Sequence, residues 1–134
     1  MNPNVATMAL VSADVDYSTL IGSTIIANLK GARVQMIACS LDRTPLSLVS
    51  RANIKAVKEV KGKTIGVGSY GSTPDIIARM VVKHHEIDPE SEIKLLALGS
   101  DAARLTALKE GVIDVMIVAP PVDFEAKRMG FNII

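Results

Sequence analysis

The chain has 134 residues, the length of one ordinary domain, and 49% of them are hydrophobic against 22% charged. Fifteen basic and fourteen acidic residues give a formal charge of +1, and the charges are scattered along the sequence. A nucleic-acid partner is therefore not expected, since it would need a basic patch. No apolar run reaches the length that spans a bilayer.

Scarce residue types narrow the chemistry further. Two tyrosines, two phenylalanines and no tryptophan are too few for a cation cage or a base-stacking platform. The single cysteine, Cys39, lies in an apolar run, where we expect a buried core residue rather than a nucleophile or metal ligand. His84 and His85 are expected at a helix C-terminus, which they suit without any metal. We therefore predict no catalytic residue, no metal and no cofactor.

The first sixty residues are expected to hold two helices joined by extended segments. Helices are predicted at 4–12 and 22–30, strands at 15–18 and 34–40, an extended segment at 44–51 and a short polar turn at 55–59. Asp16 and Asp114, each at the start of a predicted strand, are expected to accept hydrogen bonds from backbone N–H groups. Methionines on apolar faces are predicted to lie in the core: Met8, Met36, Met80 and Met116.

From residue 63 onward, strands and helices alternate with short connections. Strands are predicted at 64–67, 93–98, 114–118 and 131–134, and helices at 74–85, 102–110 and 121–128, the second of these helices capped by Ser100 or Asp101. This alternation is typical of an α/β fold whose mostly parallel sheet carries helices on both faces. In such sheets, ligands bind where the carboxyl ends of the strands converge.

The most informative segment is the glycine-rich turn between the first of these strands and its helix. Thr73 is predicted as the N-cap, Pro74 as the first helical residue and Asp75 as a first-turn acid, and each residue type is favourable there. The free N–H groups of the first turn, with the hydroxyls of Ser69, Ser72 and Thr73, can bind a phosphate, sulfonate or carboxylate. The turn could equally be only a tight, well-capped connection.

Two enzymatic interpretations of this turn have less support. Residues 66–71 match the G-x-G-x-x-G of dinucleotide-binding proteins, but no acidic residue stands at the end of the next strand to hold a ribose. A serine hydrolase is disfavoured because the chain contains no G-x-S-x-G. Both histidines are also about 18 Å along the predicted helix from Ser72 and Thr73, too far to act as their base.

Five sequence phrases resemble the type 2 solute-binding proteins of ABC importers. They are SADVDY at 12–17, LKGA at 29–32, VKGKTIGV at 60–67, LTALKEGVID at 105–114 and APP at 119–121. The resemblance runs through essentially the whole chain, and it is to the branch of nitrate, sulfonate and taurine binders with the related thiamine-pyrimidine precursor proteins. It implies two α/β lobes with a ligand held in the cleft between them.

The chain is too short for two complete lobes, so the resemblance implies a partial one. Residues 1–55 are interpreted as a remnant of the first lobe, 56–62 as a hinge and 63–134 as a near-complete second lobe with the order βαβαβα. A fragment and a natural short gene product both remain open. The resemblance implies a periplasmic or extracytoplasmic location, whereas the sequence as written has no signal peptide and would be cytoplasmic if expressed in this form.

The resemblance places ligand contacts at turns that the physical argument also selects. They are Ser18, Thr19, Gly22 and Ser23 in the first lobe, and Gly71, Ser72, Thr73, Ala119 and Pro120 in the second. Arg43 or Arg104 could add positive charge to the cleft, although a solvent-facing arginine is the commoner arrangement. Sulfonate binders tend to carry an aromatic or polar residue where this chain has Ala119-Pro-Pro, which argues against a sulfonate.

The leading prediction is a binding module without catalysis. It would be the solute-binding component, or a fragment of one, of an ABC importer, and would deliver a small anionic or heteroaromatic solute to a permease. A pyrimidine-precursor synthase is the enzymatic alternative, and the single cysteine argues against it because that branch uses clustered cysteines. The third alternative is a truncated α/β protein that only self-associates. Because a depleted lobe exposes apolar faces, we expect a homo-oligomer, most simply a two-fold dimer with exchanged elements.

Overall fold

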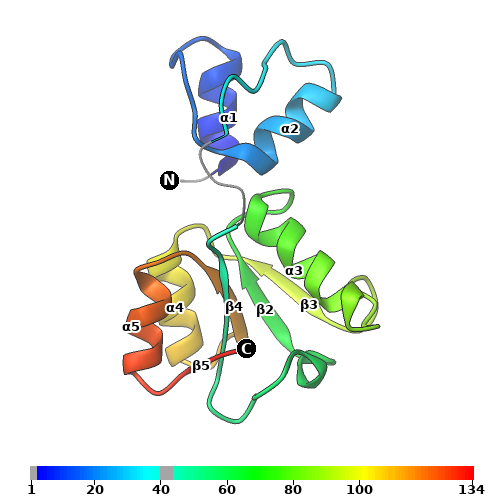
Figure 1. The fold of residues 1–134 in the computed structure, drawn as a ribbon, viewed down its shortest axis with the longest axis vertical. Coiled ribbons are helices and arrows are strands. Elements are labelled where there is room, and N and C mark those ends of the chain that lie inside the picture. The colour runs from blue at the N-terminus through cyan, green and yellow to red at the C-terminus, as the bar shows by residue number, and fades with distance from the viewer. Residues whose placement is uncertain (1–2, 40–43) are drawn as a thin grey trace.

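A computed structural model describes residues 3–39 and 44–134 of the chain (Figure 1). The helices are α1 (Pro3–Val11), α2 (Ile21–Leu29), the 3-10 helix η1 (Val57–Val60), α3 (Thr73–His84), α4 (Asp101–Lys109) and α5 (Val122–Arg128). The strands are β1 (Ser47–Ser50), β2 (Thr64–Val67), β3 (Lys94–Ala97), β4 (Val115–Val118) and β5 (Asn132–Ile133). Every helix predicted from the sequence is present, with ends that differ by one or two residues. Within the described ranges, no helix has the length and apolar character to cross a membrane.

One mixed sheet of five strands, in the order β3-β2-β4-β1-β5, organises the later part of the chain. Strand β2 pairs in parallel with β3 and β4, with Ile65 opposite Leu95 on one side and Val115 on the other. Strand β1 pairs antiparallel with β4 and with β5, so four of these strands run in one direction and β1 runs against them. The predicted α/β fold with a mostly parallel sheet is therefore confirmed.

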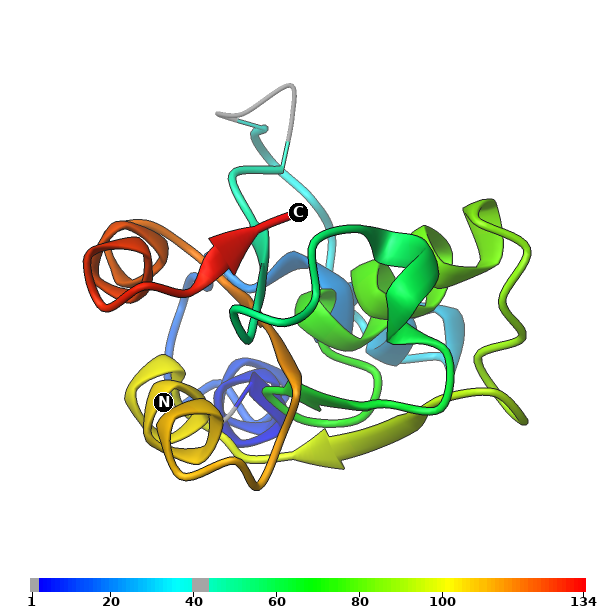
Figure 2. The ribbon, with the colours of Figure 1, turned by 90° about the horizontal axis from the view of Figure 1, so that it is seen from below.

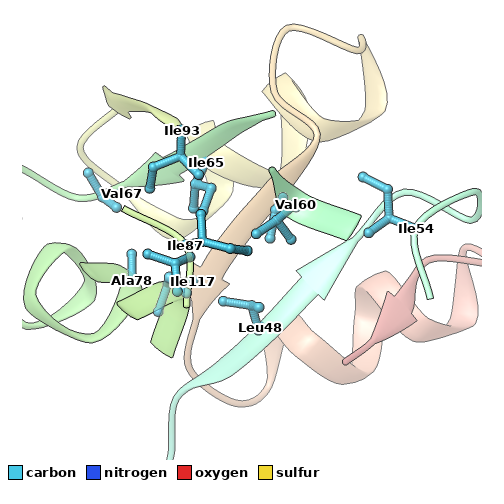
Figure 3. Close-up of a cluster of buried hydrophobic side chains, with 11 residues drawn as sticks. Leu48, Ile54, Val60, Ile65, Val67, Ala78, Ile87, Ile93 and Ile117 are labelled. Atoms are coloured by element: carbon cyan, nitrogen blue, oxygen red, sulfur yellow. The ribbon is translucent and has the colours of Figure 1, made fainter. Parts of the chain in front are cut away.

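Helices cover both faces of this sheet, α3 on one and α4 with α5 on the other (Figures 1 and 2). Strand β4 is buried along its whole length, and alternate residues point to opposite faces. Val115 and Ile117 belong to the cluster on the α3 side, which Figure 3 shows gathered around Ile65 and Val67. Met116 and Val118 belong to the cluster beneath α4 and α5.

Helices α1 and α2 lie beyond one end of the sheet (Figure 1). They contact each other through small and polar residues, and the hydroxyls of Thr7 and Ser23 share a buried hydrogen bond of 2.7 Å. The strands predicted at 15–18 and 34–40 are wrong for the described residues, since 15–18 and 34–39 are irregular and largely exposed. Ser40 lies outside the described residues. A strand needs hydrogen-bonded neighbours, and none of the five strands of the sheet pairs with these segments.

Several residues predicted to be in the core are at the surface. Met116 is fully buried as expected, but Met8, Met36 and Met80 are 71%, 61% and 65% exposed. Cys39 is exposed as well, because the segment around it forms no strand. An apolar side chain becomes buried only when another element covers it, and sequence periodicity does not show whether that element exists.

Candidate functional site

The N-termini of α2 and α3 meet at the end of the sheet. The backbone N–H of Gly22, in the first turn of α2, donates to the hydroxyl oxygen of Thr73 at 3.2 Å. Leu20, the N-cap of α2, has no side-chain acceptor of its own, so a residue 51 positions later serves that helix end. A Cβ at Gly22 would lie 2.8 Å from both the nitrogen and the hydroxyl oxygen of Thr73. The helices therefore approach this closely only with glycine at position 22.

Ser72, rather than the predicted Thr73, is the N-cap of α3, although its side chain makes no capping bond. Its hydroxyl instead donates to the Ser69 carbonyl at 2.6 Å and accepts from the Ser69 N–H at 3.2 Å. Ser72 is only 1% exposed. The turn closes at Gly71, whose φ of +77° is a conformation that residues other than glycine rarely adopt. These contacts hold the turn in one shape at the tip of β2.

Asp75 in the first turn of α3 is buried, and its charge is balanced locally. One carboxylate oxygen accepts from the Gly71 N–H at 2.8 Å, and the other pairs with Nε of Arg79 at 3.2 Å. Arg79 also pairs with Glu90. Because Asp75 is neutralised by Arg79, it offers less opposition to an anion at this helix end than an unpaired carboxylate would.

The first turn of α3 still has donors to offer. Among the described residues, the N–H groups of Thr73 and Asp75 have no hydrogen-bond acceptor. The buried hydroxyl of Ser69 likewise has no partner there. N–H groups at a helix N-terminus carry partial positive charge and bind oxyanions, and here a second helix points its own N-terminus at the same place. The arrangement is suited to a small anion.

Arg104 and Asp101 join the tips of β3 and β4, and the Gly99 N–H donates to the carbonyl of Gly68 at the tip of β2 at 2.8 Å. The Arg104 guanidinium donates to the carbonyl of Gly99 at 2.8 Å and pairs with one oxygen of Asp101, whose other oxygen accepts from the N–H of Ala119 at 3.4 Å. Ser100 caps α4 by accepting from the Ala103 N–H at 3.2 Å, as predicted. The turns after three strands therefore converge at one end of the sheet.

Sequence reasoning named Arg104 as a possible source of positive charge in the cleft but did not predict its burial. A solvent-facing side chain was the commoner expectation, whereas Arg104 is 2% exposed. Burial lowers the pKa of its guanidinium, and the charge of Asp101 opposes that shift. The pairing of Asp101 and Arg104 at positions i and i+3 of one helix was the available signal, because such residues lie on one helix face. Arg43, the other candidate, lies outside the described residues.

The predicted contact residues fall into two groups. Gly22 and Thr73 touch directly, Gly71 and Ser72 shape the same turn, and Ala119 is linked to it through Asp101. The remaining four are placed differently. Ser23 bonds Thr7 between the helices, Ser18 accepts from the Leu20 N–H at 3.2 Å in an exposed segment, and Thr19 and Pro120 are exposed.

The two aspartates predicted to be structural behave differently. The carboxylate of Asp114 accepts from the Thr64 N–H at 3.0 Å, which confirms the prediction for that residue. Asp16 is exposed and accepts no backbone hydrogen bond from any residue that the structure describes. Its predicted strand is absent, so the backbone N–H groups that it was expected to meet are not arranged around it.

Comparison with known proteins gives the family and the fold relatives of the chain. The profile of the family described as NMT1/THI5 like matches residues 2–132. The chain belongs to this NMT1/THI5-like family. A search of curated proteins gave no significant match.

Solved structures of solute-binding proteins share the fold. The alkanesulfonate-binding protein SsuA of Xanthomonas axonopodis pv. citri, bound to MOPS, matches 98% of this chain with a TM-score of 0.83 and 18% identity. The aliphatic sulphonate binding protein SsuA of Escherichia coli matches 98% of this chain with a TM-score of 0.79 and 19% identity. PhnD1 of Prochlorococcus marinus, in complex with methylphosphonate, matches 100% of this chain with a TM-score of 0.73 and 16% identity. The matched region covers 46%, 46% and 57% of those proteins, so this chain spans about half their length.

An enzyme shares the fold less closely. The desulfurization enzyme DSZB matches 66% of this chain and 40% of its own length, with a TM-score of 0.55 and 14% identity. At these identities the likeness concerns the fold alone.

Proposed function

We propose that this chain is the solute-binding component, or part of one, of an ABC-type importer, and that it binds a small anionic or heteroaromatic solute without catalysis. The observation that carries the proposal is the meeting of α2 and α3 at their N-termini, where the Gly22 N–H bonds the Thr73 hydroxyl. Two positive helix ends in contact repel each other, and an anion between them would relieve that repulsion. Geometry therefore favours the anionic class of solute.

The rest of the proposal draws on the family and on the proteins of similar fold. Several of those proteins are described as periplasmic or as ligand-binding components of import systems. We infer by analogy a permease partner and a periplasmic or extracytoplasmic location. The division into a first-lobe remnant at 1–55, a hinge at 56–62 and a second lobe at 63–134 also belongs to this proposal. Closure of two such lobes around a solute would provide the affinity.

Thermal unfolding in the presence of small anions and pyrimidines tests the proposal. Sulfate, methylphosphonate, methanesulfonate and aminopyrimidines serve as probes, and a ligand at 100 times its Kd should stabilise the protein by about 2.7 kcal/mol. Thr73→Val, which removes the hydroxyl at the helix junction, should abolish the shift. Thr106→Val, at an exposed position on α4, is the matched control and should leave it intact. No shift with any probe in a folded sample would overturn the proposal.

A second proposal, self-association, is favoured by the unusual faces of α1 and α2. Their buried contact is polar, while aliphatic side chains spaced three or four residues apart point to solvent. The outer helical face consists of Val5, Met8, Val11, Ile21, Ile25 and Leu29, with Met36 and Ile37 beyond it. A standard interface buries on the order of 800 Å² of each partner, and these eight exposed aliphatic side chains can supply the apolar part of such a surface.

We infer that a second copy of the chain covers this outer helical face. Light scattering of the purified chain at micromolar concentration should give a dimer. Met8→Glu with Ile25→Glu should convert it to a monomer, and Met80→Glu, at an equally exposed position on α3, should not. A stable monomer of 14.2 kDa would rule out self-association. It would agree instead with the outer helical face being covered, in longer relatives, by another part of the protein.

A further inference from the structure

Among the described residues, Arg104 is the one basic residue whose side chain is buried. Its burial needs an explanation. A guanidinium removed from water must be paired and hydrogen-bonded to offset its lost hydration. Arg104 satisfies this only in part. Two of its nitrogens bond Gly99 and Asp101, but the buried Nε has no partner in the part of the chain that the structure describes. An incompletely satisfied buried cation is a common feature of a binding site.

Two glycines let the Arg104 side chain reach beneath the tip of β2. A Cβ at Gly66 would lie 3.7 Å from Cδ of Arg104, so the aliphatic stem runs past that residue. A Cβ at Gly68 would lie 3.3 Å from Nη1 of Arg104 and 3.5 Å from Oγ of Ser72. The guanidinium and the Ser72 hydroxyl thus both lie close to one point that glycine leaves free. A positive charge is held directly behind the turn that begins α3.

The arrangement of charge around Arg104 is asymmetric. The Arg104 side chain is 2% exposed, whereas that of its partner Asp101 is 38% exposed. Solvent therefore screens the carboxylate more effectively than the guanidinium. The guanidinium also lies close to the turn that begins α3, since Nη1 of Arg104 and Oγ of Ser72 are both within 3.5 Å of the Cβ position of Gly68, and the helix dipole of α3 has the same sign there.

We propose that Arg104 is a positioning residue that selects ligands by charge at the α2 and α3 junction. Arg104 does not touch the solute. Its charge acts on the solute from behind the turn of Gly68 and Ser72, and its pairing with Asp101 positions the carboxylate that accepts from the N–H of Ala119. This inference rests on the proposed solute-binding function and adds a preference for dianions over monoanions. Coulomb energy is proportional to ligand charge, so a fixed cation favours a doubly charged ligand.

Sulfate and methanesulfonate separate this role from a structural one, because they share the oxyanion group and carry two charges and one. Arg104→Met should weaken sulfate about tenfold and methanesulfonate about threefold, so that the ratio of their affinities falls about threefold. Arg104→Lys keeps the charge and should preserve the ratio. Lys109→Met removes an exposed charge from the same helix and should leave both affinities unchanged.

Each outcome of this titration decides the inference. Equal losses for the two anions in Arg104→Met, or no loss, would overturn the charge-selecting role while leaving the proposed function standing. A wild-type chain that binds neither anion would overturn this inference, and if the other probes also failed it would overturn the proposed function. If Arg104→Met does not fold, Gly68→Ala is the second variant. Its Cβ would lie 3.3 Å from Nη1 of Arg104 and would move the guanidinium slightly away from the turn, so a fall in the ratio in the same direction, but smaller than threefold, is expected, and an unchanged ratio would count against the inference.

Discussion

The hydroxyl oxygen of Thr73 accepts a hydrogen bond from the backbone N–H of Gly22, and so a residue of α3 satisfies the first turn of α2 across 51 positions of sequence. This hydrogen bond joins the two-helix part of the chain to the end of the sheet, where Cδ1 of Ile26 also lies close to Gly71. It also fixes the distance between two helix N-termini, on which the proposed anion site depends.

Gly22→Ala should force α2 away from α3. The new Cβ would lie 2.8 Å from both the backbone nitrogen and the hydroxyl oxygen of Thr73. The nitrogen cannot move aside unless the whole helix moves. A loss of about 1–3 kcal/mol in the free energy of unfolding is expected, as for other overpacked sites. Urea unfolding measures it, and hydrogen exchange should be faster in the first turn of α2. Lys30→Ala, at the exposed C-cap of the same helix, should change stability by less than about 0.5 kcal/mol.

Asp75→Ala should destabilise the protein much more than a change at the other acidic partner of Arg79. Asp75 is 4% exposed, and its loss leaves the Gly71 N–H without an acceptor. About 2–3 kcal/mol is expected. Glu90, with a 76% exposed side chain, forms a surface ion pair, so Glu90→Gln should cost less than about 1 kcal/mol. Equal losses for the two variants in urea unfolding would contradict the structural role given to Asp75.

Two methionines that were both predicted to lie in the core, Met80 and Met116, should differ in how much stability is lost when each is replaced by alanine. Met116→Ala empties space in the fully buried strand β4 and should cost about 2–5 kcal/mol. Met80→Ala, at a position 65% exposed on α3, should cost less than about 1 kcal/mol. Thermal unfolding of the pair, monitored by circular dichroism, compares them directly. A large loss at Met80 would show that another surface covers it.

Acid should destabilise the loop between α3 and β3. The Ser91 hydroxyl and the Glu90 N–H lower the pKa of Asp88, and Lys61 with the Asp88 N–H lowers the pKa of Glu92. A lowered folded-state pKa contributes stability that is complete above the ordinary values of 3.8 and 4.5 and is lost as the pH falls through the lower folded values. Asp88→Asn with Glu92→Gln should therefore flatten the acid limb of stability against pH below about 4.5. An unchanged acid limb would contradict it.

Local sequence determined most of the later part of the fold. The strand at 64–67 has the bounds predicted for it, and Ser100 caps α4 with its own hydroxyl, because strand propensity and capping are decided within a few residues. Asp114 accepts a backbone hydrogen bond as predicted, but the donor is the N–H of Thr64, 50 positions away, so the sequence predicted the role of the carboxylate and not its partner.

The first sixty residues show where local reasoning ends. The apolar run at 34–39, which includes Met36, has the composition of a buried strand, yet it is irregular and largely exposed, and Met8 on α1 is exposed as well. Composition shows that a segment is able to form a strand. The strand forms only if another segment of the chain lies beside it to provide the hydrogen-bond partners. The placement of β1 between β4 and β5 was likewise not predicted, because it depends on a crossover rather than on its own four residues.

The sequence by itself determined the α/β class, the helices and the glycine-rich turn that begins α3, because periodicity, capping and glycine positions act over short distances. Only the tertiary structure decided that Gly22 faces Thr73 and that Arg104 is buried behind Gly68. Both depend on close approaches between residues far apart in sequence. Such contacts are set by how whole elements pack, and no local pattern encodes the distance between them.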